Sequence, residues 1–521
     1  MQASANQGMS PDMSAIGHAR SRADRLSQCD ESHPVCQRCA KSRKTCRWAA
    51  PVVHLENEYA SGQKKRPRGP RGALALHGPS EPVPMIHPAL SIDITSRAIA
   101  YYMAYHVPVH SGTLTVPDRE ISDFASTCIV KFGHNPTTDL AVSALALAVF
   151  SRTQNHTVAA EKATLIYHSL LRMLRANMAY VKQDHIEANL VSINILSRFE
   201  DTVHDNKSAS LGTSIILTLK SFAHSDGASA LLRLWRDNRR QEDGGASAII
   251  KQTRRGSLRS ALLRGTKLPV WLRDGAVFGE QGTDLEYDEV HARLLSLRHR
   301  LSMLLATETS PARKLTELST MIEWARGEAQ DIDQGLRTWV AKMPNCWRYQ
   351  NYDLPAVPSL IMKDTHPASM YGFSNPVDAT TWMQYFVTRM LITSTNVRIL
   401  QFSRRLDPND SAVRLEVEEC VNLLNDLSDD LARCIPSCIQ KSDISNISAS
   451  SPSQTTATII PKAEIKPYMF SQVVWPLTIA SGIENMDPER RRWFRAELAR
   501  VGRIAGYGAL ACAEDEQWLH L

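Results

Sequence analysis

The sequence predicts a mainly α-helical protein, in which a small cysteine segment precedes one large all-α domain. Three observations support this fold class. Apolar residues recur at three- and four-residue intervals over 158–180, the period of an amphipathic helix packed on a core. The segment 139–150 is apolar nearly all round, as expected of a central helix. We find no convincing run with the period-two alternation of a half-buried strand.

Size and charge set the broad class of the protein. The chain has 521 residues, of which 43% are hydrophobic, enough for a large core and roughly two to four domains. From Met1 to Gly72, 13 Lys/Arg stand against 6 Asp/Glu, a net charge of +7, whereas the whole chain carries only +6. A basic N-terminal part on a nearly neutral body favours a polyanion as partner, since clustered Lys/Arg release counterions from phosphates.

The elements are expected in the following order. Residues 1–17 are polar without apolar periodicity, which predicts disorder. The cysteine segment spans 18–48, a basic and Pro-rich linker spans 49–90, and the all-α domain extends over 91–521. In that domain Asp139 is the expected N-cap of the helix 139–150. Besides this helix and 158–180, we expect helices at 186–199, 211–219, 227–235, 284–306, 310–330, 378–400, 411–434 and 488–512.

Two stretches interrupt this helical pattern. The Gly/Arg-rich segment 238–264 and the Ser/Thr/Asn-rich segment 442–458 are expected to be exposed loops. The arginines of the first segment are also compatible with a second phosphate-binding patch, although a solvated loop or helix face is the commoner outcome. A turn is expected at 224–228, before the helix 227–235.

Membrane insertion and disulfide bonding are not expected. The longest nearly apolar run, Leu140 to Phe150, has 11 residues, whereas a bilayer needs roughly 20. No N-terminal stretch has the pattern of an export signal. The cysteines outside the N-terminal segment are scattered and indicate buried thiols of a reducing compartment. A small metal or redox site at Cys434 and Cys438 is the less favoured alternative.

The cysteine segment carries the most specific chemistry. Its four cysteines follow the spacing C-x6-C-x2-C-x6-C, with Pro34 inside and a Lys/Arg run before the last cysteine. Thiolates at such spacing bind zinc, and about 30 residues need metal binding to supply their folding free energy. These features resemble the second half of the fungal six-cysteine binuclear zinc cluster found in transcription factors.

The resemblance implies a ligand set for zinc. In that family two Zn²⁺ ions share six thiolates. Carried over residue by residue, the third to sixth ligands are Cys29, Cys36, Cys39 and Cys46. The positions of the first two cysteines hold Ala19 and Arg22, which cannot ligate a metal, so the residues present predict at most one tetrahedral Zn²⁺. His18 or His33 is an alternative fourth ligand, and a segment without metal is the other interpretation.

The resemblance also assigns basic residues to DNA and to nuclear import. The candidate DNA contacts are Arg25, Arg38, Lys41, Arg43, Lys44 and Arg47. In the family, basic residues of the first helix contact base edges, and at those positions this chain has a basic residue only at Arg25. The basic residues of the second half contact phosphates, which position a protein on DNA without reading its sequence. The candidate nuclear localisation signal, within 63–72, consists of Lys64, Lys65, Arg66, Arg68 and Arg71. A solvated charge run is the alternative.

The body from Ser91 onward resembles the helical regulatory region that accompanies these clusters. The similarity consists of weak motifs in the same order, such as 98–105, 382–389 and 492–495. It implies a nuclear, pathway-specific regulator of RNA polymerase II genes that controls a nutrient-use or secondary-metabolite gene cluster. Expected partners are double-stranded DNA, a nuclear import receptor, a small-molecule effector or co-regulator, and a second copy of the chain, but no membrane.

The missing half of the cluster leaves a second function open. The runner-up is a regulator without specific DNA binding that acts through protein partners of its helical body. The missing half of the cluster is either encoded on an upstream exon that this chain lacks, which we favour, or lost by decay. We expect no enzyme, because neither the Gly502–Gly508 glycines nor the His106 and His110 pair, separated by Pro108, forms a convincing catalytic or metal motif.

Overall fold

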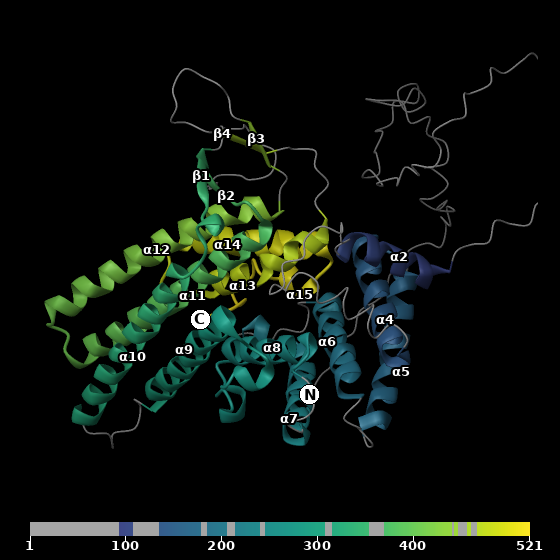
Figure 1. Ribbon diagram of the computed structural model, residues 1–521, viewed down its shortest axis with the longest axis horizontal. Helices are drawn as coiled ribbons and strands as arrows, with labels where there is room; N and C mark the ends of the chain where they lie inside the picture. Colours follow the sequence, from purple (N-terminus) through teal and green to yellow (C-terminus); the bar gives the residue numbers. More distant parts are fainter. Residues whose placement is uncertain are drawn as a thin grey trace, which may run out of the picture. The chain divides into compact units, whose positions relative to one another are not determined.

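Helices form about 80% of the described part of the chain, which confirms the mainly α prediction (Figure 1). The computed structural model describes residues 93–107, 135–178, 185–205, 214–239, 245–307, 315–353, 369–439, 442–445, 456–459 and 466–521. The α-helices are α2 (Ile94–His106), α4 (Pro136–Thr153), α5 (Thr157–Met178), α6 (Ile186–Val203), α7 (Ser221–Asn238), α8 (Ala248–Arg264), α9 (Gly282–Thr307), α10 (Leu315–Ala341), α11 (Pro376–Leu406), α12 (Ser411–Ile439), α13 (Val474–Gly482), α14 (Pro488–Ala505) and α15 (Gly508–Ala511). Short 3-10 helices are η6 (Ile215–Thr218), η7 (Val270–Leu272), η8 (Ala276–Phe278), η9 (Asn345–Trp347) and η10 (Pro467–Gln472).

The first group of helices is built around α4, which packs against α2, α5 and α6 (Figure 1). The helix is buried along most of its length, as its apolar sequence predicts. It begins three residues earlier than expected, because the side chain of Asn135, not of Asp139, accepts the first free backbone N–H, from Thr137 at 3.0 Å. Pro136 suits this position, since a proline at the first helical residue loses no intrahelical hydrogen bond. The predicted stripe of α5 is confirmed, with Ala159, Ala163, Tyr167, Leu170 and Leu174 buried.

The second group consists of α9, α10, α11 and α12, in which consecutive helices pack side by side (Figure 1). The C-terminal helices join the two groups: α13 packs on α11, and α15 packs on α6. Backbone hydrogen bonds from Ile215 to Gln517 (2.7 Å) and from Ile216 to Trp518 (3.2 Å) fasten the last residues to η6. The hydrophobic core is therefore continuous through both groups.

Four sequence expectations need correction. The predicted loop 238–264 is largely the helix α8, whose apolar residues are buried and whose end is set by Gly265 in the left-handed region, φ 62°. The predicted turn 224–228 lies inside α7. The predicted helix 211–219 appears, among its described residues, only as η6. The predicted helix 488–512 ends at Ala505, because Gly506 adopts φ 75° and starts a new direction.

A small sheet was not predicted from the sequence. Its strands are β1 (Gln350–Asp353), β2 (Ser369–Gly372), β3 (Ser442–Ser445) and β4 (Thr456–Ile459), in the order β2-β1-β4-β3. β1 and β2 are antiparallel, as are β3 and β4, whereas β1 meets β4 in parallel through one pair of residues. Strands of four residues are too short to show a clear period of two. The ends of the predicted loop 442–458 are therefore a paired ribbon.

Candidate functional site

The residues that the sequence nominates for zinc, DNA and nuclear import lie outside the described ranges. They are Cys29, Cys36, Cys39 and Cys46; Arg25, Arg38, Lys41, Arg43, Lys44 and Arg47; and Lys64, Lys65, Arg66, Arg68 and Arg71. Those assignments stay predictions from the sequence. The geometry of a candidate site comes instead from the helical domain.

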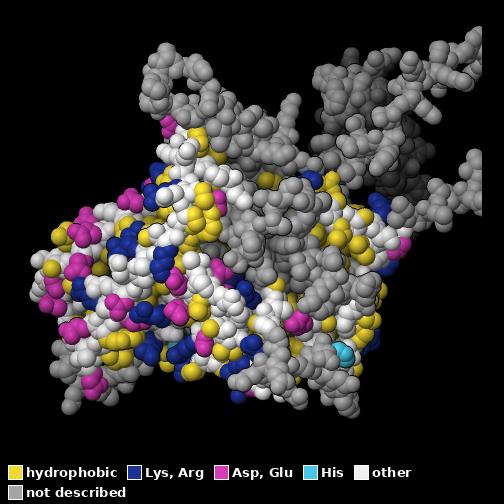
Figure 2. Space-filling model, viewed as in Figure 1, with side chains coloured by type: hydrophobic (Ala, Val, Ile, Leu, Met, Phe, Trp, Pro, Cys, Tyr) yellow, Lys and Arg dark blue, Asp and Glu magenta, His cyan; other side chains and the backbone are white. Residues whose placement is uncertain are grey.

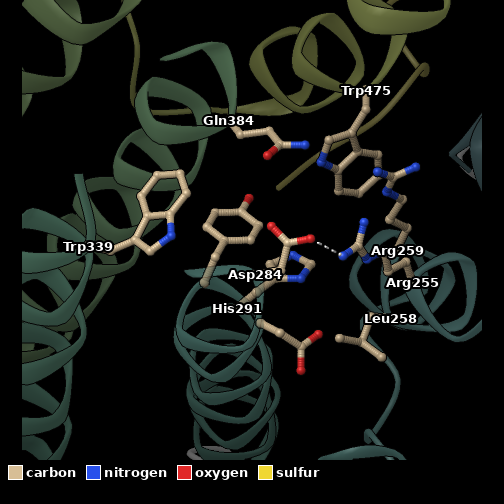
Figure 3. A pocket seen from close by; sticks show the side chains of 10 residues that line it. Arg255, Leu258, Arg259, Asp284, His291, Trp339, Gln384 and Trp475 are labelled. Carbon is tan, nitrogen blue, oxygen red and sulfur yellow. Dashed lines mark hydrogen bonds and ion pairs between the residues drawn. The ribbon is translucent and has the colours of Figure 1, made fainter. Parts of the chain in front are cut away.

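A pocket lies where α8, α9, α10, α11 and α13 meet (Figure 3). It has a volume of about 60 Å³ and is partly open to solvent. Its principal side chains are Arg255, Arg259, Tyr287, His291, Trp339 and Trp475. Leu258, Asp284, Asp288 and Gln384 complete the wall. We call this site the arginine pocket.

Helix periodicity explains how these side chains meet. Arg255 and Arg259 are four residues apart on α8 and therefore share one helix face. On α9 the spacing of Asp284, Asp288 and His291 likewise places them on one face. Figure 3 shows the side chains from α8 and α9 facing Trp475 and Gln384, which come from α13 and α11. The pocket is thus assembled from segments that are far apart in the sequence.

Two of the arginines on α8 are neutralised by acidic partners. Arg254, which is 0% exposed, donates to the two carboxylate oxygens of Asp288 at 2.6 and 2.7 Å and to the carbonyl of Leu272 at 2.9 Å. Arg255 binds Glu280 through two hydrogen bonds and donates to Asp284 at 3.1 Å. Burial opposes the charge of Arg255, but Glu280 and then Asp284 outweigh it and raise the pKa of the guanidinium.

Arg259 differs from its neighbours. Among the residues that the structure describes, none forms a hydrogen bond or an ion pair with its guanidinium, which lies over the ring of Trp475 at 5.1 Å from the centroid. Burial lowers the pKa of Arg259 to about 10; Tyr287 opposes this shift in part, and the positive charge of Arg255 adds to it by a smaller amount. Arg259 is therefore a wall arginine whose guanidinium has no direct acidic partner among the described residues.

Neutral polar groups and aromatic rings form the rest of the wall. Burial, together with the charges of Arg259 and Arg254, lowers the pKa of His291 to about 3, so that the imidazole is neutral at pH 7. The hydroxyl of Tyr287 lies 2.8 Å from that of Thr388. The indole N–H of Trp339 donates to the carbonyl of Thr283 at 2.7 Å. These hydrogen bonds hold the two rings in place and leave the wall polar but rigid.

A second hollow lies between α9 and α10 and is more open. Its volume is about 400 Å³, and we call it the tryptophan groove, after Trp324, which is 40% exposed. Arg300 lies over Trp324 at 4.9 Å from the ring centroid. At the same groove Arg293 donates to both oxygens of Glu328, at 2.9 and 3.0 Å. The groove therefore also contains an arginine–tryptophan pair, but on the surface.

The cysteine pair and the C-terminal glycines that the sequence singles out lie in packed surroundings. Cys434 and Cys438 are buried, and burial raises the pKa of both thiols, which makes them unreactive; Cys346, in contrast, is exposed rather than buried as expected. In the described ranges no group of three metal-binding side chains occurs. Nor does any helix there have the length and hydropathy to cross a membrane. Gly502 serves close packing, because a Cβ would lie 2.5 Å from the backbone nitrogen of Ala511.

Comparison with known proteins adds no assignment: no family model, no curated protein and no solved structure matches the chain. The arginine pocket was not predicted from the sequence. One signal for it was present, namely two arginines four residues apart in a segment bounded by Ser247 and Gly265, residue types that begin and end helices. Reading the segment as a loop concealed that shared face.

Proposed function

We propose that this protein is a nuclear regulator of transcription, which binds double-stranded DNA through its zinc-dependent cysteine segment. The observation that carries the proposal is the spacing of Cys29, Cys36, Cys39 and Cys46 among basic side chains. Such spacing suits one tetrahedral Zn²⁺, and the neighbouring Lys/Arg residues suit phosphate contacts. The linker residues 63–72 would direct the protein to the nucleus.

The charge distribution of the body supports placing DNA contacts in the N-terminal segment. Over the described residues on the face drawn in Figure 2, basic and acidic side chains are interspersed on the α10–α12 side. Many arginines of the body pair with carboxylates, as Arg264 does with Asp226 and Arg490 with Asp429. A surface of mixed sign does not attract a polyanion, whereas the N-terminal part carries a clear excess of positive charge.

Zinc content tests the ligand assignment. The full chain, purified without chelator, is expected to contain about one Zn²⁺, by the four-ligand argument. Replacing Cys36 and Cys39 by Ser should remove it, because two ligands cannot hold a structural zinc. The matched control replaces Cys346 and Cys420, two free thiols of the helical domain, and should retain the metal. Unchanged zinc in the Cys36/Cys39 variant would refute the assignment.

DNA binding tests the function itself. Selection from random duplexes, followed by titration of the selected and a scrambled duplex at several salt concentrations, separates the two candidate functions. A preference retained at physiological salt supports the sequence-specific regulator. Weak binding that vanishes as salt rises supports the runner-up, a regulator that acts through protein partners. Ala19 and Arg22, which occupy the first two ligand positions, favour this second candidate.

A further inference from the structure

We propose that the arginine pocket binds a small ligand through an oxyanion group, a carboxylate or a phosphate, which pairs with Arg259 and contacts Trp475. This inference goes beyond the proposed function and does not rest on it, because it uses only residues of the helical domain. A regulator that responds to a metabolite would need a site of this kind.

The balance of charge is the first step of the argument. Arg254 and Arg255 have carboxylate partners at hydrogen-bonding distance, whereas Arg259, on the same helix, has none among the described residues. Arg259 is half-buried, and a guanidinium partly withdrawn from water without a counter-ion lowers the stability of the folded protein. An anion bound in the pocket would remove that cost, because it would supply the missing partner.

The shape of the pocket limits the size of the anion. One buried water needs roughly 10–15 Å³ of such volume, so a pocket of about 60 Å³ accepts several waters or a small charged group. A guanidinium presents a planar fork of N–H donors that matches the paired oxygens of a carboxylate or phosphate. The opening to solvent allows a larger remainder of the ligand to extend outward.

The rest of the wall suits an anion with few charges. His291 is neutral and, with the amide of Gln384, offers hydrogen bonds without adding a positive charge. The carboxylates of Asp284 and Asp288 also line the pocket, although Arg255 and Arg254 bind them. This pairing limits their repulsion of a single oxyanion at Arg259, whereas a pocket of about 60 Å³ has no room for the run of phosphates of a nucleic acid backbone. The site therefore fits a free small molecule.

Titration of the full chain with two probes tests the proposal. Acetate and inorganic phosphate are added separately at constant ionic strength set with sodium chloride, and neutral acetamide is the control for shape. The readouts are the melting temperature and tryptophan fluorescence, to which Trp475 contributes as the ring next to Arg259. We expect a saturable response to at least one anion and none to acetamide. The anion that produces the response shows whether the ligand carries a carboxylate or a phosphate.

Variants assign the response to the pocket. Arg259→Gln is expected to weaken binding on the order of tenfold or more, as the loss of one charge-assisted pair. Arg259→Lys, which keeps the charge but loses the planar fork of donors, should bind with intermediate affinity. It keeps the proposal testable if Arg259→Gln does not fold. Arg300→Gln is the matched control, since Arg300 also lies over a tryptophan but outside the pocket, and should bind as the unmodified chain does.

The proposal fails under either of two results. One is the absence of a saturable response of the unmodified chain to both anions. The other is a folded Arg259→Gln variant that binds with unchanged affinity. Duplex binding, measured on the same preparations, keeps the two proposals separate, because loss of DNA binding with anion binding retained would overturn only the proposed function.

Discussion

The arginine pocket and the tryptophan groove contain the same pair of side chains in different surroundings. In the pocket Arg259 lies 5.1 Å from the ring centroid of Trp475, and in the groove Arg300 lies 4.9 Å from that of Trp324. The pocket is small and both members of its pair are half-buried, whereas the groove is wide, Arg300 is exposed and Trp324 is 40% exposed. The two pairs are thus alike in geometry and unlike in access to water.

This difference shows what a contact between a cation and a ring can explain. An exposed cation–π pair is worth roughly 0.5–1 kcal/mol and a desolvated pair about 2 kcal/mol, so the ring stabilises Arg259 more than Arg300. Water solvates the charge of Arg300 in addition, but it reaches Arg259 less, which is why burial lowers the pKa of Arg259 to about 10. Only the pocket arginine therefore needs a further partner.

The largest expected effect concerns the ion pairs of the two sites. Asp288→Ala should lower the free energy of unfolding by about 3–5 kcal/mol, because it removes both carboxylate hydrogen bonds of the fully buried Arg254 and leaves only Glu280, at 4.0 Å, near its charge. Glu328→Ala in the groove is the matched change, since Glu328 also binds an arginine through two hydrogen bonds. There the loss should stay below about 1 kcal/mol, because Arg293 is 45% exposed.

Urea denaturation of both variants, followed by circular dichroism, measures this difference. Equal losses for Asp288→Ala and Glu328→Ala would show that burial does not distinguish the two sites. A loss confined to Asp288→Ala would show that a buried arginine beside the pocket depends on its carboxylate partner, whereas an exposed one does not.

The second effect is a dependence of stability on pH. His291 has a pKa of about 3 in the folded protein and an ordinary value near 6.5 when unfolded. Between these values the unfolded chain binds more protons, so the free energy of unfolding falls as pH decreases from 6.5 toward 3. His291 faces the charges of Arg254 and Arg259 and stacks with Tyr287, and its share of the fall is about 2–3 kcal/mol by pH 4.

The variant His291→Gln removes this share and should flatten the pH profile between 6.5 and 4. Denaturation midpoints at several pH values measure the slope. His168→Gln, at an exposed position of α5, is the control and should leave the slope unchanged. An equally steep profile in His291→Gln would mean that other groups cause the acid sensitivity.

The sequence predicted most helices because their apolar residues repeat at the helical period. The stripe of α5 and the apolar α4 needed no information beyond neighbouring residues. The helix α8 was missed because its arginines and Gly256 resemble a loop in composition. Two of those arginines, Arg254 and Arg255, point to carboxylates that lie on or just before α9, and no local pattern reveals such partners.

The candidate site shows the same limit. The pocket brings together Arg259, His291 and Trp475 from three helices, and only the packing of those helices decides that they meet. The spacing of two arginines on α8 is visible in the sequence. That no carboxylate of the described ranges pairs with Arg259 is visible only in the structure. The cysteine segment is the opposite case, since its spacing alone predicts its chemistry.

The smallest expected effect is the most direct check of the comparison. Arg259→Met and Arg300→Met both remove a charge over a tryptophan and keep an unbranched apolar stem, although the side chain becomes shorter. Without ligand, Arg259→Met should change the free energy of unfolding by less than about 1 kcal/mol, because the lost cation–π contact is offset by removal of an uncompensated charge. Arg300→Met should be close to neutral, since its charge is solvated.

Anion then separates the two variants. With saturating acetate or phosphate, whichever binds, the unmodified chain and Arg300→Met should gain stability, whereas Arg259→Met should not, because a ligand stabilises only a folded state that binds it. Urea denaturation with and without the anion measures the stability of each variant and the stability that it gains from the anion. If Arg259→Met without ligand were destabilised by more than about 2 kcal/mol, the guanidinium would be a packing element of the folded domain. Its missing carboxylate would then no longer indicate a ligand.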